Sequence, residues 1–140
     1  MRATLLRAMA LFVGLHLARG GFALACSCLE DEQTPEERLL TWDMVFVGEV
    51  VDPEQAASGC GGGKTDDVVT VFAVKEGFQG VTRGDEVEVH HNRDGAACGG
   101  TFVAGEDWLL YTDGAWSLCS PGGPATAHAS EIEALRDATN

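Results

Sequence analysis

The stretch from Ala23 to Cys28 sets the tightest limits on how this chain can fold. Residues 1–25 are typical of a secretory signal peptide, with a basic start, an apolar run over 8–17 and small residues before the expected Ala25/Cys26 cleavage site. The apolar run is too short to span a bilayer as a helix of the mature protein. Removal of 25 of the 140 residues leaves 115, enough for one domain with a single core.

The same boundary is compatible with a second processing route. Bacterial lipoproteins are cut just before a cysteine, which then receives lipid, and Cys26 stands at that place. Ala23, however, occupies the position where leucine is more usual. We therefore expect a secreted protein, extracellular or periplasmic, with a lipid anchor at Cys26 as the alternative.

The charge of the mature protein narrows the choice of partners. The whole chain carries a formal net charge of −13, and the signal segment contains three basic residues and no acidic ones, so the mature charge is −16. A domain this acidic repels copies of itself and disfavours phosphate backbones. We expect a monomer that does not bind nucleic acid and that meets a membrane only if Cys26 is lipidated.

Short β-strands separated by turn residues dominate the middle of the chain. Val87 and Val89 alternate with polar residues, so they should face inward. Gly48 should bend the first strand. Strands are expected at 44–51, 68–75, 86–91, 108–112 and 115–119, the last two as a hairpin around Asp113-Gly114, with loops at 52–67 and 92–100 and a turn at 77–80.

Two capping-box patterns predict short helices outside the strands. The first pairs Thr34 with Glu37, with Pro35 at the first helical position. That helix should end near Trp42 and pack its apolar residues on the sheet, namely Leu39, Leu40 and Trp42. The second pairs Ser130 with Glu133 and opens a helix that carries Ile132 and Leu135 on one side.

These elements predict a mainly β fold. About five short strands with peripheral helices are typical of a five-stranded Greek-key barrel of the OB type, and a small β-sandwich is the competing architecture. The expected divisions of the chain are a signal peptide at 1–25, an OB-like domain at 26–120 and a tail with a short helix at 121–140.

Five cysteines remain after cleavage, at positions 26, 28, 60, 98 and 119. Export favours disulfides, so two bridges and one unpaired cysteine are expected. Cys26 and Cys28 would lie about 6–7 Å apart on one side of an extended segment, which is poor geometry for a bridge between them. Each is therefore expected to pair with a distant cysteine, and the sequence alone leaves the pairing open.

Several patterns suggest other chemistry but lack its context. Residues 58–65 nearly match a phosphate-binding loop, but Ser58 replaces the first glycine and a strand follows. His90 and His91 should point to opposite faces of a strand, which disfavours a joint metal site. Glu30-Asp31-Glu32 and Asp66-Asp67 are interpreted as solvated charge, and His128 is placed in a mobile tail. We expect no enzyme, no cofactor and no bound metal.

Five short motifs, in their order and spacing, carry a family resemblance over residues 26–120. They are Cys26-Ser27-Cys28, Val45-Phe46-Val47-Gly48, Gly77-Phe78-Gln79-Gly80, Cys98-Gly99 before Phe102, and Trp108-Leu109-Leu110-Tyr111 leading to Cys119. The pattern resembles the netrin-like OB-fold family, and within it the N-terminal domain of the tissue inhibitors of metalloproteinases. Animal members carry a third bridge in this domain and a second, cysteine-rich domain, and both are absent from this sequence.

The resemblance implies a disulfide framework and an inhibitory edge. It implies the bridges Cys26–Cys98 and Cys28–Cys119 and leaves Cys60 unpaired. It also implies that the α-amine and carbonyl oxygen of Cys26 chelate the zinc of a metalloprotease, whose catalytic zinc keeps an open position. Ser27 would point toward the protease's specificity pocket, and Ala96-Ala97 would form the neighbouring contact.

Three hypotheses follow from these observations. The leading one is a secreted inhibitor of zinc metalloproteases that acts through Cys26, Ser27 and Cys28. The alternative is a non-inhibitory binding module of the netrin-like type at the cell surface, which lipidation of Cys26 would favour because a modified amine cannot chelate. A thiol-dependent redox role through Cys60 is the third. The resemblance by itself does not establish the function of its relatives.

Overall fold

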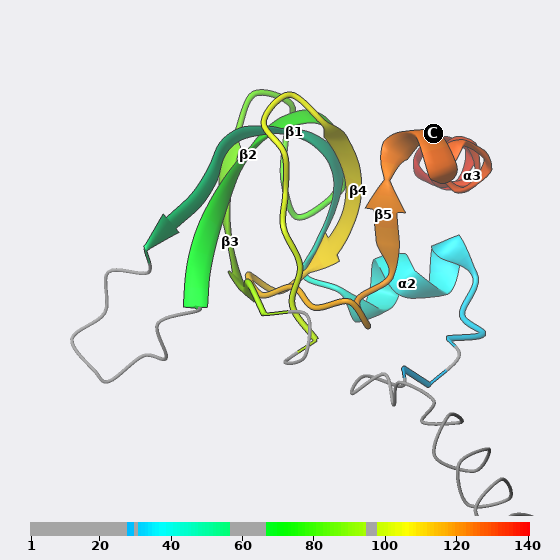
Figure 1. The fold of residues 1–140 in the computed structure, drawn as a ribbon. Helices are drawn as coiled ribbons and strands as arrows, with labels where there is room; N and C mark the ends of the chain where they lie inside the picture. Colours follow the sequence, from blue (N-terminus) through cyan, green and yellow to red (C-terminus); the bar gives the residue numbers. More distant parts are fainter. Residues whose placement is uncertain (1–27, 30, 57–66, 95–97) are drawn as a thin grey trace, which may run out of the picture.

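The computed structural model describes residues 28–29, 31–56, 67–94 and 98–140. They form one antiparallel sheet of five strands in the order β3-β2-β1-β4-β5, with helices α2 and α3 beside it (Figure 1). The elements in chain order are α2 (Pro35–Thr41), β1 (Met44–Ala56), β2 (Asp67–Gln79), β3 (Glu86–Asn92), β4 (Asp107–Thr112), β5 (Gly122–Pro124), the 3₁₀ turn η2 (Ala125–Ala127) and α3 (Ala129–Thr139).

The expectation of a mainly β fold is confirmed. The strands form a single curled sheet, so the competing two-sheet sandwich is not found among the residues described. β1 is the central strand and pairs with both β2 and β4. Its register against β2 shifts between Val47 and Gly48, which confirms the bend predicted at this glycine. A Cβ at Gly48 would lie 2.8 Å from the Phe46 ring, so the bend leaves no room for a side chain.

The predicted hairpin around Asp113-Gly114 is wrong. The chain leaves β4 and crosses to β3, where the amide of His90 donates to the carbonyl of Gly114 and the amide of Trp116 donates to the carbonyl of His90, both at 2.9 Å. This contact is a parallel bridge between His90 and Ala115, and it replaces the strand expected at 115–119. The hairpin partner of β4 is β5, which the sequence analysis did not predict.

The hydroxyl of Thr112 explains this change of direction. It accepts a hydrogen bond from the amide of Gly114 at 2.9 Å and donates one to the carbonyl of Ala115 at 2.7 Å. These bonds hold a compact bend that turns the chain out of the β4 ladder. The bend brings Ala115 against the free edge of β3. The chain that follows β4 is thereby paired with the strand at the opposite edge of the sheet.

Two other predicted boundaries move because the strands are longer than expected. β1 continues through Ala56 into the predicted 52–67 loop, and β2 continues through Gln79 into the predicted 77–80 turn. The turn begins only at Gly80, whose φ of 68° suits glycine. A Cβ at Gly80 would lie 2.0 Å from the carbonyl oxygen of Asp43, so the strand can end here only with glycine.

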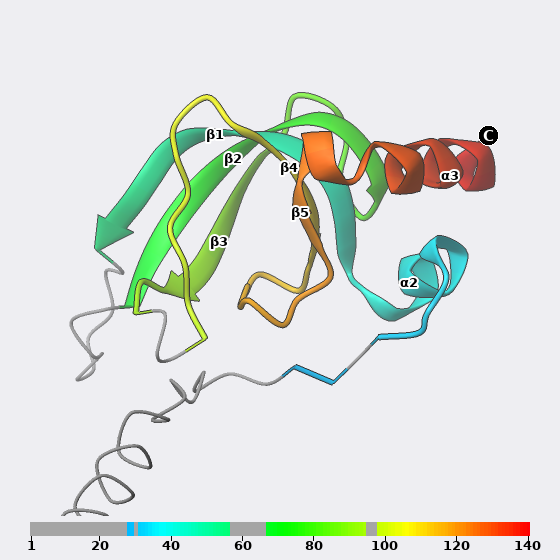
Figure 2. The ribbon, with the colours of Figure 1, turned by 45° about the vertical axis from the view of Figure 1, so that its right-hand side comes forward.

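The sheet has a hydrophobic cluster on each face. The inner cluster is built on large side chains from several strands: Phe46, Val50, Phe72, Val74, Val87, Val89, Phe102, Leu110 and Trp116. The outer cluster lies between the sheet and α3, and consists of Val45, Val47, Leu109, Tyr111, Ile132 and Leu135. β1 and β4 contribute to both clusters, which explains the near-continuous apolar run in β1. Figure 2 shows α3 lying along the outside of the sheet near α2.

Helix α2 begins as predicted, with a complete capping box between Thr34 and Glu37. Leu39 and Trp42 pack against the outer cluster, but Leu40 is 90% exposed, so its predicted contact with the sheet is wrong. A helix of seven residues turns only one narrow face toward the sheet, and Leu40 lies off that face.

Helix α3 begins at Ala129, with His128 as its N-cap and no side-chain capping bond, so the predicted Ser130 capping box is wrong. Ile132 and Leu135 are buried, as expected. The mobile tail predicted around His128 is also wrong, because its Nδ1 lies 3.0 Å from Glu131. No helix in the described part of the chain is long and apolar enough to cross a membrane.

Candidate functional site

A disulfide joins Cys28 to Cys119 across 91 positions of sequence, with 5.2 Å between the two Cα atoms. This is the pairing that the family resemblance implies. Both cysteines are exposed, so the bridge lies at the surface. We call the residues that precede α2 the lead segment (residues 28, 29 and 31–34). The disulfide ties this segment to the turn that follows the β-bridge between His90 and Ala115. A disulfide of this kind is typical of an oxidising, non-cytoplasmic environment.

Cys98 lies beside this bridge. Its carbonyl accepts a hydrogen bond from the amide of Leu118 at 2.9 Å, and Leu118 directly precedes Cys119. Cys98 is itself disulfide-bonded. Its expected partner, Cys26, lies outside the described residues, as do Ser27, Cys60, Ala96 and Ala97 of the predicted site.

The local fold around Cys98 depends on the glycine that follows it. Cys98 has a φ of 59°, in the left-handed region, and a Cβ at Gly99 would lie 1.7 Å from the carbonyl oxygen of Asn92. The amide of Gly100 donates to that same carbonyl at 2.9 Å. Close backbone packing therefore requires glycine after Cys98, and it holds this turn against the end of β3.

Two exposed leucines flank the Cys28–Cys119 bridge. Leu29 is 95% exposed and Leu118 is 52% exposed. Each directly follows or precedes a bridged cysteine, so both side chains are held at one edge of the molecule by the disulfide. The bridge thus has an exposed apolar side chain next to each of its two cysteines.

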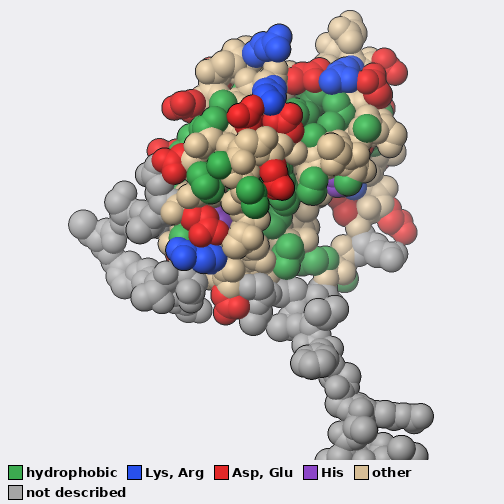
Figure 3. Space-filling view, turned by 45° about the horizontal axis from the view of Figure 1, so that its top comes forward, with side chains coloured by type: hydrophobic (Ala, Val, Ile, Leu, Met, Phe, Trp, Pro, Cys, Tyr) green, Lys and Arg blue, Asp and Glu red, His purple; other side chains and the backbone are tan. Residues whose placement is uncertain are grey.

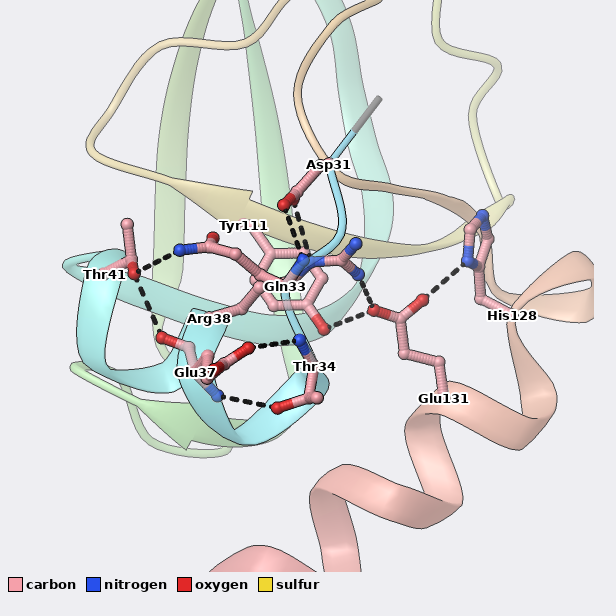
Figure 4. A network of polar contacts seen from close by, with 9 residues as sticks. All are labelled: Asp31, Gln33, Thr34, Glu37, Arg38, Thr41, Tyr111, His128 and Glu131. Carbon is pink, nitrogen blue, oxygen red and sulfur yellow. Dashed lines mark hydrogen bonds and ion pairs between the residues drawn. The ribbon is translucent and has the colours of Figure 1, made fainter. Parts of the chain in front are cut away.

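A network of polar contacts holds the other end of the lead segment (Figure 4). The Nε of Arg38 lies 3.0 Å from Asp31 Oδ2, and its Nη1 pairs with Glu131 Oε1. The hydroxyl of Tyr111 donates to Glu131 Oε1 at 2.7 Å, and His128 Nδ1 lies 3.0 Å from Glu131 Oε2. The Arg38 guanidinium also lies over the Tyr111 ring, 5.4 Å from its centroid.

Sequence reasoning missed this network. Asp31 was expected to be solvated charge, and the contact with Arg38 corrects that expectation. The spacing of Thr34 and Glu37 predicts the capping box that ends the lead segment, but nothing local predicts Glu131, which lies 93 positions from Arg38. Only the packing of α3 near α2 brings this carboxylate to the lead segment.

The electrostatics of Glu131 favour its charged form. Burial opposes the charge, but the hydrogen bonds from Tyr111 and His128 and the positive charge of Arg38 together hold the pKa of the carboxyl below its ordinary value. The same contacts act on the Tyr111 phenol, where burial and the Glu131 carboxylate raise the pKa. The network is therefore a set of charge-assisted contacts around one carboxylate.

The depressed pKa of Glu131 predicts a loss of stability in acid. The carboxylate contributes stability above the unfolded-state value of about 4.3, and that contribution is lost as the pH falls through the lower folded-state pKa. Urea titrations at pH 6 and at pH 3 should therefore give a smaller difference in unfolding free energy for Glu131→Gln than for the wild type. An equal difference in both proteins would contradict a charged, stabilising Glu131.

The two adjacent histidines point to opposite sides of β3, as predicted. His90 is exposed, whereas His91 is 5% exposed and its Nε2 lies 2.9 Å from the hydroxyl of Thr70. Burial lowers the pKa of His91 and favours its neutral form. Within the part of the chain that the structure describes, no group of three histidine, cysteine or acidic side chains could hold a metal ion.

Several basic side chains in the described part of the surface lie next to carboxylates. Lys75 lies 2.7 Å from both Glu49 and Asp107, and Arg136 lies 2.7 Å from Glu76. Figure 3 shows one face of the molecule, on which carboxylates are widespread and the few basic groups stand close to them. These pairs neutralise much of the local positive charge, so the surface potential is set by the remaining carboxylates.

No protein-family model and no curated protein matches the chain.

Proposed function

We propose that the protein is an exported inhibitor of zinc metalloproteases and that it acts through the N-terminus created by cleavage before Cys26. The α-amine and carbonyl oxygen of Cys26 bind the protease's catalytic zinc at the position that water otherwise occupies. An α-amine has a reference pKa near 8, so at neutral pH it loses its proton at small cost and becomes a ligand. Ser27 enters the specificity pocket, and Ala96-Ala97 contacts the adjoining surface.

The observation that carries the proposal is the position of the Cys28–Cys119 bridge beside Cys98. Cys28 is bonded to Cys119, and the amide of Leu118 donates to the carbonyl of Cys98. Two adjacent residues of one turn therefore hold the two positions: Cys119 holds Cys28, and Leu118 holds Cys98. The proposed edge needs this proximity, because it combines the residues before Cys28 with those before Cys98.

Rigidity of the lead segment supports the same proposal. The disulfide holds it at Cys28, Arg38 holds it at Asp31, and the capping box holds it at Thr34. A segment held in its bound shape loses less entropy when it binds a target. The exposed side chains of Leu29 and Leu118 add apolar surface next to the Cys28–Cys119 bridge.

The decisive test alters only the N-terminal amine. Protein that begins at Cys26 is compared with the same protein carrying one added N-terminal alanine, and with a matched control carrying one alanine after Asn140. The first and third forms should inhibit members of a panel of zinc metalloproteases equally. The N-terminally extended form should inhibit at least about 100-fold less well, which corresponds to about 2.7 kcal/mol. Equal inhibition by the extended form would contradict chelation, and inhibition by none of the forms would contradict the proposed function.

A lipid-anchored binding module is the second candidate, and the cysteine immediately after the expected cleavage site favours it. A lipidated protein carries a diacylglyceryl group on the sulfur of Cys26, which removes the thiol that the expected Cys26–Cys98 bridge needs, and acylation of its amine would prevent zinc chelation. Intact-mass measurement of the protein exported by its native host separates the two candidates. A free amine at Cys26 supports the inhibitor, whereas an added diacylglyceryl mass supports the anchored module.

A further inference from the structure

Glu131 is the point at which the C-terminal helix reaches the lead segment. Its Oε1 pairs with Arg38 Nη1 and accepts a hydrogen bond from the hydroxyl of Tyr111. Its Oε2 lies 3.0 Å from His128 Nδ1. Figure 4 shows the carboxylate of Glu131 and the guanidinium of Arg38 facing one another, with Asp31 on the far side of the arginine. Three elements thus meet around one acidic side chain.

Arg38 connects Glu131 to the lead segment. It uses separate nitrogens, with Nη1 on Glu131 and Nε on Asp31. Its side chain is only 14% exposed, and Glu131 is 16% exposed, so water competes weakly for this pair. Asp31 is 34% exposed, and its other carboxylate oxygen accepts the amide of Gln33 at 3.0 Å. One aspartate therefore links the arginine to the backbone of the lead segment.

We propose that Glu131 is a positioning residue for the lead segment and that it acts through Arg38 on Asp31, three residues after the disulfide-bonded Cys28. Glu131 fixes the plane of the Arg38 guanidinium over the Tyr111 ring, and the Nε of that guanidinium then holds Asp31. The role in inhibition rests on the proposed function above. The ordering of the lead segment is a property of the free protein and can be tested without any protease.

The charge of Glu131 can be removed without disturbing the contacts that hold α3 on the sheet. Ile132 and Leu135 provide those contacts, and both are buried in the outer cluster. Glutamine at position 131 keeps the size of the side chain and an oxygen that can accept from Tyr111, but it loses the ion pair with Arg38. Glu133 on the same helix is the matched control, because its side chain is 67% exposed and pairs only with Arg136 among the ion pairs of the described residues.

The test is a double-mutant cycle with Glu131→Gln and Asp31→Asn, made singly and together. Hydrogen exchange reports the order of the backbone amides in the lead segment. Each single variant should exchange these amides about tenfold faster and inhibit about tenfold less well, a factor that corresponds to about 1.4 kcal/mol. The double variant should resemble either single variant, because both substitutions break the same chain of contacts. Glu133→Gln should match the wild type in both measurements.

The outcomes separate this proposal from the proposed function. Unchanged exchange in Glu131→Gln, or effects of the two substitutions that add, would overturn the positioning role. If wild-type protein inhibits no protease, the proposed function fails, and the exchange data still decide the role of Glu131. If Glu131→Gln does not fold, Arg38→Lys takes its place, since a single ammonium cannot copy the two-sided contact of the guanidinium. Slow exchange in that variant would overturn the proposal, and fast exchange would support it.

Discussion

Replacing Phe102 with alanine is expected to lower the free energy of unfolding by about 3–5 kcal/mol, the range for removing a buried aromatic side chain. Phe102 is 3% exposed although it lies in the connection between β3 and β4 and in no strand. Its ring makes edge-to-face contacts with four others, and the centroid distances are 5.1 Å to Phe72, 4.8 Å to His91, 4.7 Å to Trp108 and 4.9 Å to Trp116. Such pairs add to the stability that area burial alone provides.

The neighbouring residue offers a matched control for this prediction. Val103 is 58% exposed, so Val103→Ala should change stability by less than about 1 kcal/mol. Urea denaturation, followed by tryptophan fluorescence, measures both variants, because Trp108 and Trp116 lie against the Phe102 ring. A loss in Phe102→Ala no larger than that in Val103→Ala would show that the connection does not hold the inner cluster together.

Replacing both Cys28 and Cys119 with serine is expected to lower the free energy of unfolding by about 2–5 kcal/mol. The bridge closes a long loop, because the two cysteines are separated by 91 positions in sequence, and its removal frees the unfolded chain more than the folded one. The effect in the folded state should be confined to the lead segment, because Asp31 and Thr34 still hold its far end.

Two measurements check the disulfide prediction. Urea denaturation should show the loss of stability, and hydrogen exchange should become faster at residues 28 and 29 than at residue 34, which the capping box still protects. Changing both cysteines avoids leaving one unpaired thiol that could form a new bridge. Unchanged stability and exchange in the double variant would contradict a bridge that fixes the lead segment.

The lead segment is held by a disulfide at Cys28 and by an ion pair at Asp31, and only the first of these contacts could be predicted from the sequence. The bridge between Cys28 and Cys119 was predicted, because the expected export favours disulfides and the resemblance described under Sequence analysis implies this pairing. The contact at Asp31 depends on Arg38, which is on a predicted helix, and on Glu131, which no local pattern connects to either residue. The sequence therefore predicted the bridge at Cys28 but not the network around Arg38.

Local chemistry explains the elements that the sequence predicted well. The Thr34–Glu37 capping box needs only residues within one helical turn, and the alternation at Val87 and Val89 needs only the two-residue period of a strand. The Asp113-Gly114 pattern failed for the opposite reason. It is a good hairpin signal by itself, but the free edge of β3 offers His90 as a partner for the chain beyond it.

The sequence by itself determined the mainly β character of the protein, the first helix and its cap, the bend at Gly48 and the alternation that buries Val87 and Val89. Each of these depends on interactions between residues that are close together in the chain. Only the tertiary structure decided that Leu40 faces solvent, that the chain after β4 joins β3, and that Glu131 reaches the lead segment through Arg38. These features depend on which distant surfaces meet, and that outcome is set by how the whole core packs.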